Sequence, residues 1–192
     1  MGNLSLKKTF GLAKEFFKNP KQIGAIAPSS KFLAEKLVKA GNLENAKVII
    51  ELGAGTGIIT KKILELMPED AILLSFEINS LLSRHIEENI KDERLRIIND
   101  DARHIAGHIN KLGFQYVDCV ISGLPLAVFS KEETRQMLDI IDNCLSEEGK
   151  YIQFQYSISD MMALKKVFPK VNLDFEMRNI PPAFVYVCSK SI

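Results

Sequence analysis

A glycine-rich segment directly after an apolar run is the part of the sequence best suited to bind a small ligand. Residues 51–57 have the sequence ELGAGTG, which begins with Glu51. Glycines at the end of a strand let the backbone turn sharply and approach a ligand closely. Gly53, Gly55 and Gly57 are spaced G-x-G-x-G, whereas a dinucleotide site uses G-x-G-x-x-G. The spacing therefore favours a ligand that carries no diphosphate.

Two further acidic positions follow the next two strand-like runs. Glu77 lies twenty residues after Gly57 and is followed by Ile78. A carboxylate at this place can accept hydrogen bonds from both hydroxyls of a ribose. Asp101 follows the third run. It could belong to the same ligand site, or it could simply cap a helix that begins at Ala102.

Together these features resemble the cofactor site of the class I methyltransferases, which use S-adenosylmethionine. In that class the glycine loop wraps the amino-acid end and the ribose of the cofactor. The resemblance implies that Glu51, Glu77 and Ile78 belong to the site, that Asp101 accepts the adenine amino group, and that Ala102 offers its backbone. A purely structural glycine turn is the alternative.

The fourth strand-like run ends in Ser122-Gly123-Leu124-Pro125. This segment is similar to the motif with which amino-group methyltransferases hold the target nitrogen, and the similarity places Ser122 in the polar position, facing both cofactor and acceptor. No aromatic residue follows Pro125, so the motif lacks a platform for a flipped adenine base. A simple turn from strand to loop is the alternative.

Four segments together resemble the small bacterial phospholipid N-methyltransferases, which methylate phosphatidylethanolamine stepwise and are themselves similar to the ribosomal RNA adenine dimethylases. The segments span nearly the whole chain, and the most distinctive part is Gly-Ala-Ile-Ala-Pro-Ser-Ser within the first of them. They cover residues 17–30, 122–126, 153–156 and 178–183.

Polar and aromatic residues near the end of the fifth run are the candidates for handling an amine. Tyr156 shares a strand face with Phe154, and we expect it to orient or deprotonate the amine and to stabilise its charge by a cation–π contact. Asn179 could orient the amine through its carbonyl oxygen. Ser29 and Ser30, before a predicted helix, could hold a carboxylate or phosphate. The alternatives are that Tyr156 is an ordinary aromatic residue of the core and that Ser29 and Ser30 simply cap the helix.

Strand-like runs that alternate with helical stretches predict a Rossmann-like, doubly wound α/β fold. The link at Pro181-Pro182 is too short for a crossover helix, so we expect five parallel strands followed by an antiparallel pair at one edge. The predicted strands cover 47–52, 71–77, 95–99, 116–122, 149–156, 171–177 and 183–189. The predicted helices cover 4–18, 30–40, 58–67, 79–92, 101–111, 130–145 and 158–168, of which the first two precede the sheet.

The composition fits one domain of 192 residues with 46% hydrophobic and 26% charged residues. We expect a helical substrate or membrane segment at 1–42 and the cofactor-binding core at 43–192. The scattered cysteines suit a reducing cytoplasm, and no run is long enough to span a bilayer. We expect no metal site, because His104 and His108 lack a third ligand and the acid of an HExxH motif.

Positive charge is concentrated near the N-terminus. Residues 1–22 contain five lysines and one glutamate, whereas the whole chain has a net charge of only +1. The lysines flank an apolar stripe of Leu6, Phe10, Ala13 and Phe17, which suits a helix lying on an anionic membrane surface. The alternative is a helix that covers its own domain.

The sequence therefore predicts a methyltransferase that uses S-adenosylmethionine to methylate a phospholipid amine, in the cytoplasm or on the inner face of the membrane. The low net charge disfavours nucleic acid, and no feature calls for an obligate protein partner. The alternatives are a soluble small-molecule N-methyltransferase, a ribosomal RNA adenine N6-methyltransferase and a non-catalytic binder of the cofactor.

Overall fold

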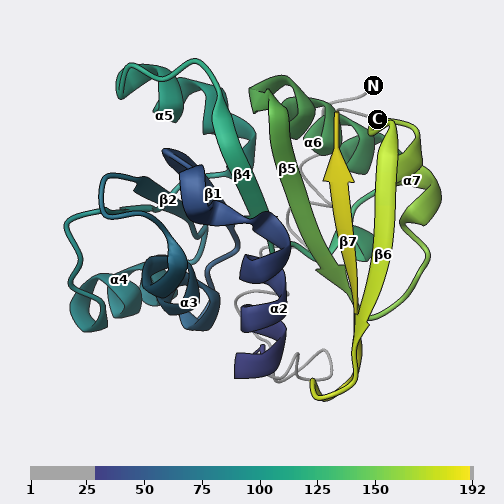
Figure 1. Cartoon of the computed structure of the whole chain (residues 1–192), viewed down its shortest axis with the longest axis horizontal. Coiled ribbons are helices and arrows are strands. Elements are labelled where there is room, and N and C mark those ends of the chain that lie inside the picture. Colours follow the sequence, from purple (N-terminus) through teal and green to yellow (C-terminus); the bar gives the residue numbers. More distant parts are fainter. Residues whose placement is uncertain (1–28, 191–192) are drawn as a thin grey trace.

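A computed structural model of the chain describes residues 29–190 as a seven-stranded sheet covered by helices on both faces (Figure 1). The strand order is β3-β2-β1-β4-β5-β7-β6. The first five strands are parallel, and β7 lies antiparallel between β5 and β6. The strands are β1 (Val48–Leu52), β2 (Ile72–Phe76), β3 (Leu95–Ile98), β4 (Val117–Ser122), β5 (Leu145–Gln155), β6 (Lys170–Glu176) and β7 (Ala183–Ser189). The predicted fold class is confirmed.

The helices begin and end where the sequence supplies capping groups. Ser30 caps the first described helix by accepting a hydrogen bond from the Leu33 N–H, and Ser130 and Glu133 form a reciprocal capping box on the longest one. The α-helices are α2 (Lys31–Gly41), α3 (Ile58–Leu66), α4 (Ser80–Asn89), α5 (Ile105–Lys111), α6 (Lys131–Cys144) and α7 (Met161–Lys165). Short 3₁₀ turns are η1 (Leu43–Asn45), η2 (Ala102–His104) and η3 (Leu126–Val128). None of the helices described here is both long and apolar enough to cross a membrane.

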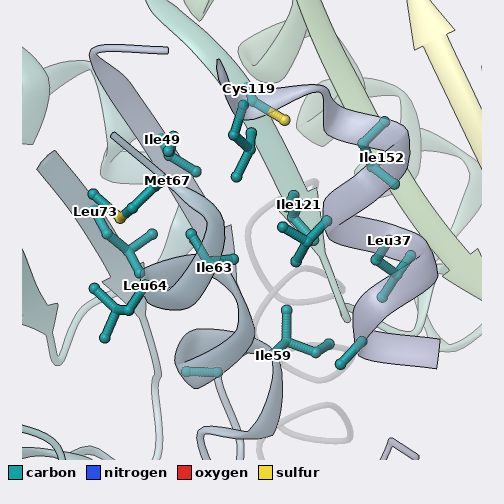
Figure 2. Packing of buried hydrophobic residues seen from close by; sticks show 14 of the residues in the cluster. Leu37, Ile49, Ile59, Ile63, Leu64, Met67, Leu73, Cys119, Ile121 and Ile152 are labelled. Carbon is teal, nitrogen blue, oxygen red and sulfur yellow. The ribbon is translucent and has the colours of Figure 1, made fainter. Parts of the chain in front are cut away.

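The two faces of the sheet are packed by different helices. One hydrophobic cluster joins α2, α3 and α4 to one face, and its members include Leu37, Ile63 and Ile121 (Figure 2). The other joins α5, α6 and α7 to the opposite face around residues such as Tyr151 and Phe168, whose rings stack at 5.5 Å. Apolar side chains therefore point both ways from each central strand, as buried parallel sheets require.

The predicted boundaries differ from the structure mainly around β5 and α7. The strand begins at Leu145, immediately after α6, because Val117 pairs with Leu145 before the register shifts and Cys119 pairs with Lys150. The helix predicted at 158–168 is only Met161–Lys165. The helix predicted at 101–111 is divided into η2 and α5.

The predicted helix at 4–18, together with the rest of the basic segment, lies outside the described residues. Helix α2 confirms the other helix predicted before the sheet, and it packs on the sheet as part of the core. The division at residue 42 remains a prediction. All three cysteines are buried, and burial raises the pKa of the Cys119 and Cys188 thiols to about 12.

Leu37→Ala should lower the free energy of unfolding by about 2–5 kcal/mol, because the side chain is fully buried against the sheet and its loss leaves a cavity. Chemical denaturation would measure the loss. Leu66→Ala is the matched control, since Leu66 is 45% exposed at the end of α3 and should change stability by less than about 1 kcal/mol. Equal losses in the two variants would contradict the packing of α2.

Candidate functional site

The glycine loop after β1 is held to the end of β2. The backbone N–H groups of Gly53 and Ala54 both donate to the carbonyl oxygen of Phe76, at 2.9 and 3.2 Å. Gly53, Gly55 and Gly57 have φ angles of 78°, 57° and 80°, a region that favours glycine. The loop therefore keeps this path only because its sequence supplies glycine at alternate positions.

The three glycines face different surroundings. A Cβ atom on Gly53 would lie 3.3 Å from the Leu124 side chain, and one on Gly57 would lie 3.0 Å from Ile90. A Cβ atom on Gly55 would have no neighbour within 4 Å. Gly53 and Gly57 thus allow close packing within the protein, whereas Gly55 borders open space.

Glu77 lies directly beside this open position and supports the loop. Its carboxylate is 1% exposed, and it accepts hydrogen bonds of 2.8 Å from the N–H groups of both Gly55 and Asn79. Burial raises the pKa of Glu77, although these donors and the N–H of Ile78 act in the opposite direction. The ribose role of Glu77 stays a prediction, and the sequence did not reveal that Glu77 also fixes the loop.

Glu51 is buried beneath the loop with one oxygen satisfied and the other unpaired. Its Oε2 accepts from the hydroxyl groups of Thr60 and Ser75, at 2.7 and 2.5 Å. Its Oε1 is buried and has no hydrogen-bond partner among residues 29–190. Burial raises the pKa of Glu51 to about 7. Thr60 and Ser75 were not predicted, although Ser75 stands opposite Glu51 in the parallel register of β1 and β2.

Asp101 caps η2, which was the alternative to its adenine role. The Arg103 N–H donates to Asp101 Oδ1 at 2.9 Å, and the Arg103 guanidinium contacts both carboxylate oxygens. Ala102 is the first residue of η2 and is 9% exposed. Capping does not use all the lone pairs of the carboxylate, so an adenine contact remains compatible with this geometry.

The two histidines face a carboxylate. His104 Nδ1 and His108 Nε2 each lie 2.9 Å from a different oxygen of Asp100. These contacts hold the pKa of Asp100 well below its usual range. Within the described part of the chain, no group of three or more histidine, cysteine or acidic side chains is arranged to hold a metal ion.

Ser122 lies inside the protein, where its hydroxyl accepts the Leu124 N–H at 3.2 Å. The carbonyl oxygen of Leu124 in turn accepts from the side-chain amides of Gln153 and Gln155, both at 3.0 Å. Ser122 thus shapes the loop after β4, and its side chain does not reach solvent. The two glutamines were missed as part of the site because amides at alternate positions of a strand carry no specific signal.

Asn179 connects the β6–β7 hairpin to α2. Its Oδ1 accepts the Ser30 N–H at 2.9 Å, and its Nδ2 donates to the Pro181 carbonyl at 2.7 Å. The Asn179 side chain is 1% exposed, so its carbonyl oxygen already has a partner. Ser30 is a helix cap, which was the alternative to an anion-binding role.

Tyr156 lies close to Asn179 at the carboxyl end of β5. Its ring meets that of Phe154 edge-on at 5.9 Å, which agrees with their expected shared face. Its hydroxyl is buried and has no hydrogen-bond partner of normal geometry within residues 29–190, and burial raises the pKa of the phenol despite the nearby Asn179. Among the three catalytic candidates, Tyr156 alone is only partly buried.

The strand order, the glycine loop and the acids at successive strand ends define a class I methyltransferase that depends on S-adenosylmethionine. The ribosomal RNA adenine dimethylase family model matches residues 10–107, and the chain belongs to that family.

The relatives include enzymes with different acceptors. The chain is 32% identical over 189 residues to an ornithine lipid N-methyltransferase of Singulisphaera acidiphila, which covers 95% of this chain and 96% of that one. It is 33% identical over 111 residues to the ribosomal RNA small subunit methyltransferase A of Mesomycoplasma hyopneumoniae, covering 58% of this chain but 39% of the relative. A crystal structure of precorrin-6y C5,15-methyltransferase from Geobacter metallireducens has the same fold, with a TM-score of 0.65, 15% identity and coverage of 83% and 88%.

Gly55→Ala should weaken binding of S-adenosylhomocysteine at least tenfold, because the new methyl group projects into the open space beside Glu77. Isothermal titration calorimetry would measure the affinity. Gly113→Ala is the matched control, since Gly113 also has a positive φ, of 83°, and open space around it. Both variants carry the backbone strain, at a cost of about 1–2 kcal/mol, but only the first should lose affinity. Equal affinities would contradict the site.

Glu51→Gln should reduce the pH dependence of stability in the ligand-free protein. The pKa of Glu51 is raised from 4.5 to about 7, so its contribution to stability is complete below pH 4.5 and is lost as pH rises through 7. The free energy of unfolding falls by roughly 3 kcal/mol, at 1.36 kcal/mol for each pKa unit between the two states. Urea unfolding at pH 5 and pH 8 would show a smaller decrease for the variant. Parallel decreases would contradict a protonated Glu51.

Proposed function

We propose that this methyltransferase transfers methyl groups to the amine of a membrane lipid. The observation that carries the proposal is the similarity to the ornithine lipid N-methyltransferase, which extends over 95% of this chain. The acceptor expected from the sequence, phosphatidylethanolamine, shares with an ornithine lipid a primary amine near the membrane surface. We therefore define the substrate class by this amine rather than by one lipid.

The groups that we assign to S-adenosylmethionine lie at the carboxyl ends of β1, β2 and β3 or in the loops that follow them. We assign Glu77 to the ribose, Asp101 to the adenine amino group and the open face of Gly55 to the closest backbone approach. The unpaired, buried Oε1 of Glu51 can accept a hydrogen bond from a ligand or from a water bound with it. When bound, the cofactor supplies a methyl group on a positively charged sulfonium.

The acceptor amine must lose a proton to water before it attacks, since an alkylammonium has a pKa of about 10. Because burial raises the pKa of the Tyr156 phenol, we assign Tyr156 to orienting the amine rather than to deprotonating it. Its partly exposed ring can stabilise the positive charge that develops on the nitrogen as the methyl group is transferred. Removal of the amine from water lowers the pKa of the amine and thereby favours the neutral, reactive form.

The loop after β4 favours an amine over a flipped base. Leu126, which follows Pro125, is 1% exposed and belongs to the core cluster of α5, α6 and α7. An aromatic platform for a base is therefore replaced by a buried aliphatic side chain. The ribosomal RNA activity of other family members remains the second candidate, because the family model covers residues 10–107.

An acceptor comparison would test this function. We expect labelled methyl groups from S-adenosylmethionine to enter ornithine lipid or phosphatidylethanolamine in mixed micelles, and not soluble amines or ribosomal RNA. Label in RNA alone would support the second candidate, and label in soluble amines alone would contradict a lipid acceptor.

Tyr156→Phe should retain most of the lipid methylation, whereas Tyr156→Leu should lower kcat/KM about tenfold or more, because the ring rather than the hydroxyl faces the amine. Affinity for S-adenosylhomocysteine serves as the control and should be the same in both variants. Equal activity of the Phe and Leu variants would contradict the cation–π role.

A further inference from the structure

The turn between β6 and β7, residues 177–182, displays apolar side chains to solvent. Ile180 and Met177 are 82% and 75% exposed, the largest values among the exposed large apolar residues of the described chain. Pro181 and Pro182 are also exposed, and Asn179 is the one buried residue of the turn. Several exposed apolar side chains within one short turn can mark an interaction surface.

The turn is held in place by polar contacts rather than left loose. Asn179 is hydrogen-bonded to the Ser30 N–H and to the Pro181 carbonyl. Arg178 pairs with Glu176 and lies over the Phe32 ring, 4.4 Å from its centroid. These contacts fix the backbone, so that Met177 and Ile180 point outward at little further entropic cost.

The turn lies at the end of the sheet that carries the candidate site. In Figure 1 it extends beyond the carboxyl end of β5, on the same side of the molecule as the start of α2. Within the turn, Asn179 is hydrogen-bonded to Ser30 and lies near Tyr156, the candidate residue for contact with the acceptor amine. A surface that docks through this turn therefore lies near Tyr156.

One basic side chain next to the turn favours an anionic surface. Lys31 and Arg178 both lie over the ring of Phe32, and Arg178 is paired with Glu176, whereas Lys31 forms no ion pair within residues 29–190. In the sequence, residues 1–22 carry a net charge of +4, and Lys21 precedes Ser30 by nine residues. In the sequence, these basic residues therefore come shortly before Ser30, which contacts the turn.

We propose that Met177 and Ile180 insert into the headgroup region of an anionic bilayer and hold the open end of the site against the lipid amines. This inference rests on the proposed lipid acceptor but concerns a different property, namely attachment to the membrane. Apolar side chains at the interface contribute hydrophobic free energy, while the basic residues supply attraction that weakens with salt.

Met177→Ser combined with Ile180→Ser should weaken binding to phosphatidylcholine–phosphatidylglycerol vesicles at least tenfold in a sedimentation assay, at low and at high salt. Leu66→Ser, on the other end of the molecule, is the matched control and should bind as the unmodified protein does. Melting temperatures would verify that both variants fold. Unchanged vesicle binding of the double variant would overturn the proposal, as would conversion of a dimer into a monomer with vesicle binding intact.

A fluorescent label would report insertion directly. The native cysteines are buried, so a thiol-reactive environment-sensitive dye should attach selectively to Ile180→Cys or to the control Leu66→Cys. Vesicles should shift the emission of the first to shorter wavelength and leave the second unchanged. Equal responses would overturn insertion of the turn.

Methylation of a short-chain, monomeric aminolipid separates the two proposals. This soluble substrate needs no docking, so the double Ser variant should methylate it at the normal rate. A protein that inserts Ile180 into vesicles but methylates no lipid would contradict the proposed function and leave the attachment supported.

Discussion

The carboxylate of Glu77 fixes the geometry on which the candidate site depends. It joins the end of β2 to the glycine loop after β1 through the Gly55 N–H, and to the start of α4 through the Asn79 N–H. Both N–H groups belong to loops that leave the carboxyl ends of parallel strands, where the backbone no longer pairs within the sheet. A buried carboxylate is costly unless such donors surround it. The same group that we assign to the ribose therefore determines the path of the loop that approaches the ligand.

Much of this architecture could be predicted because its signals are local. Strand-like runs with helical stretches between them predicted a doubly wound α/β fold, and Pro181-Pro182 predicted the antiparallel pair. The glycine spacing and the acids at strand ends were equally visible. The start of β5 at Leu145 was not, because it depends on pairing with Val117 in another strand and on the register shift that follows.

The parts of the site that could not be predicted depend on contacts between distant residues. The role of Asn179 toward an amine stays a prediction, but the sequence did not reveal that its carbonyl oxygen accepts the Ser30 N–H, 149 positions earlier in the chain. The role of Ser122 toward the cofactor stays a prediction as well, and its hydroxyl also accepts the Leu124 N–H. A polar side chain near a strand end can serve either the loop or the ligand, and only the fold decides which donors lie within reach.

Burial of the three cysteines has a consequence for the chemistry of the protein under oxidative stress. Burial raises the pKa of the Cys119 and Cys188 thiols, so both stay protonated at neutral pH. Peroxides and disulfides react with the thiolate, and a buried thiol is also shielded from contact with them. The folded enzyme should therefore remain reduced and active without an added thiol, and its cysteines should react only when the sheet opens.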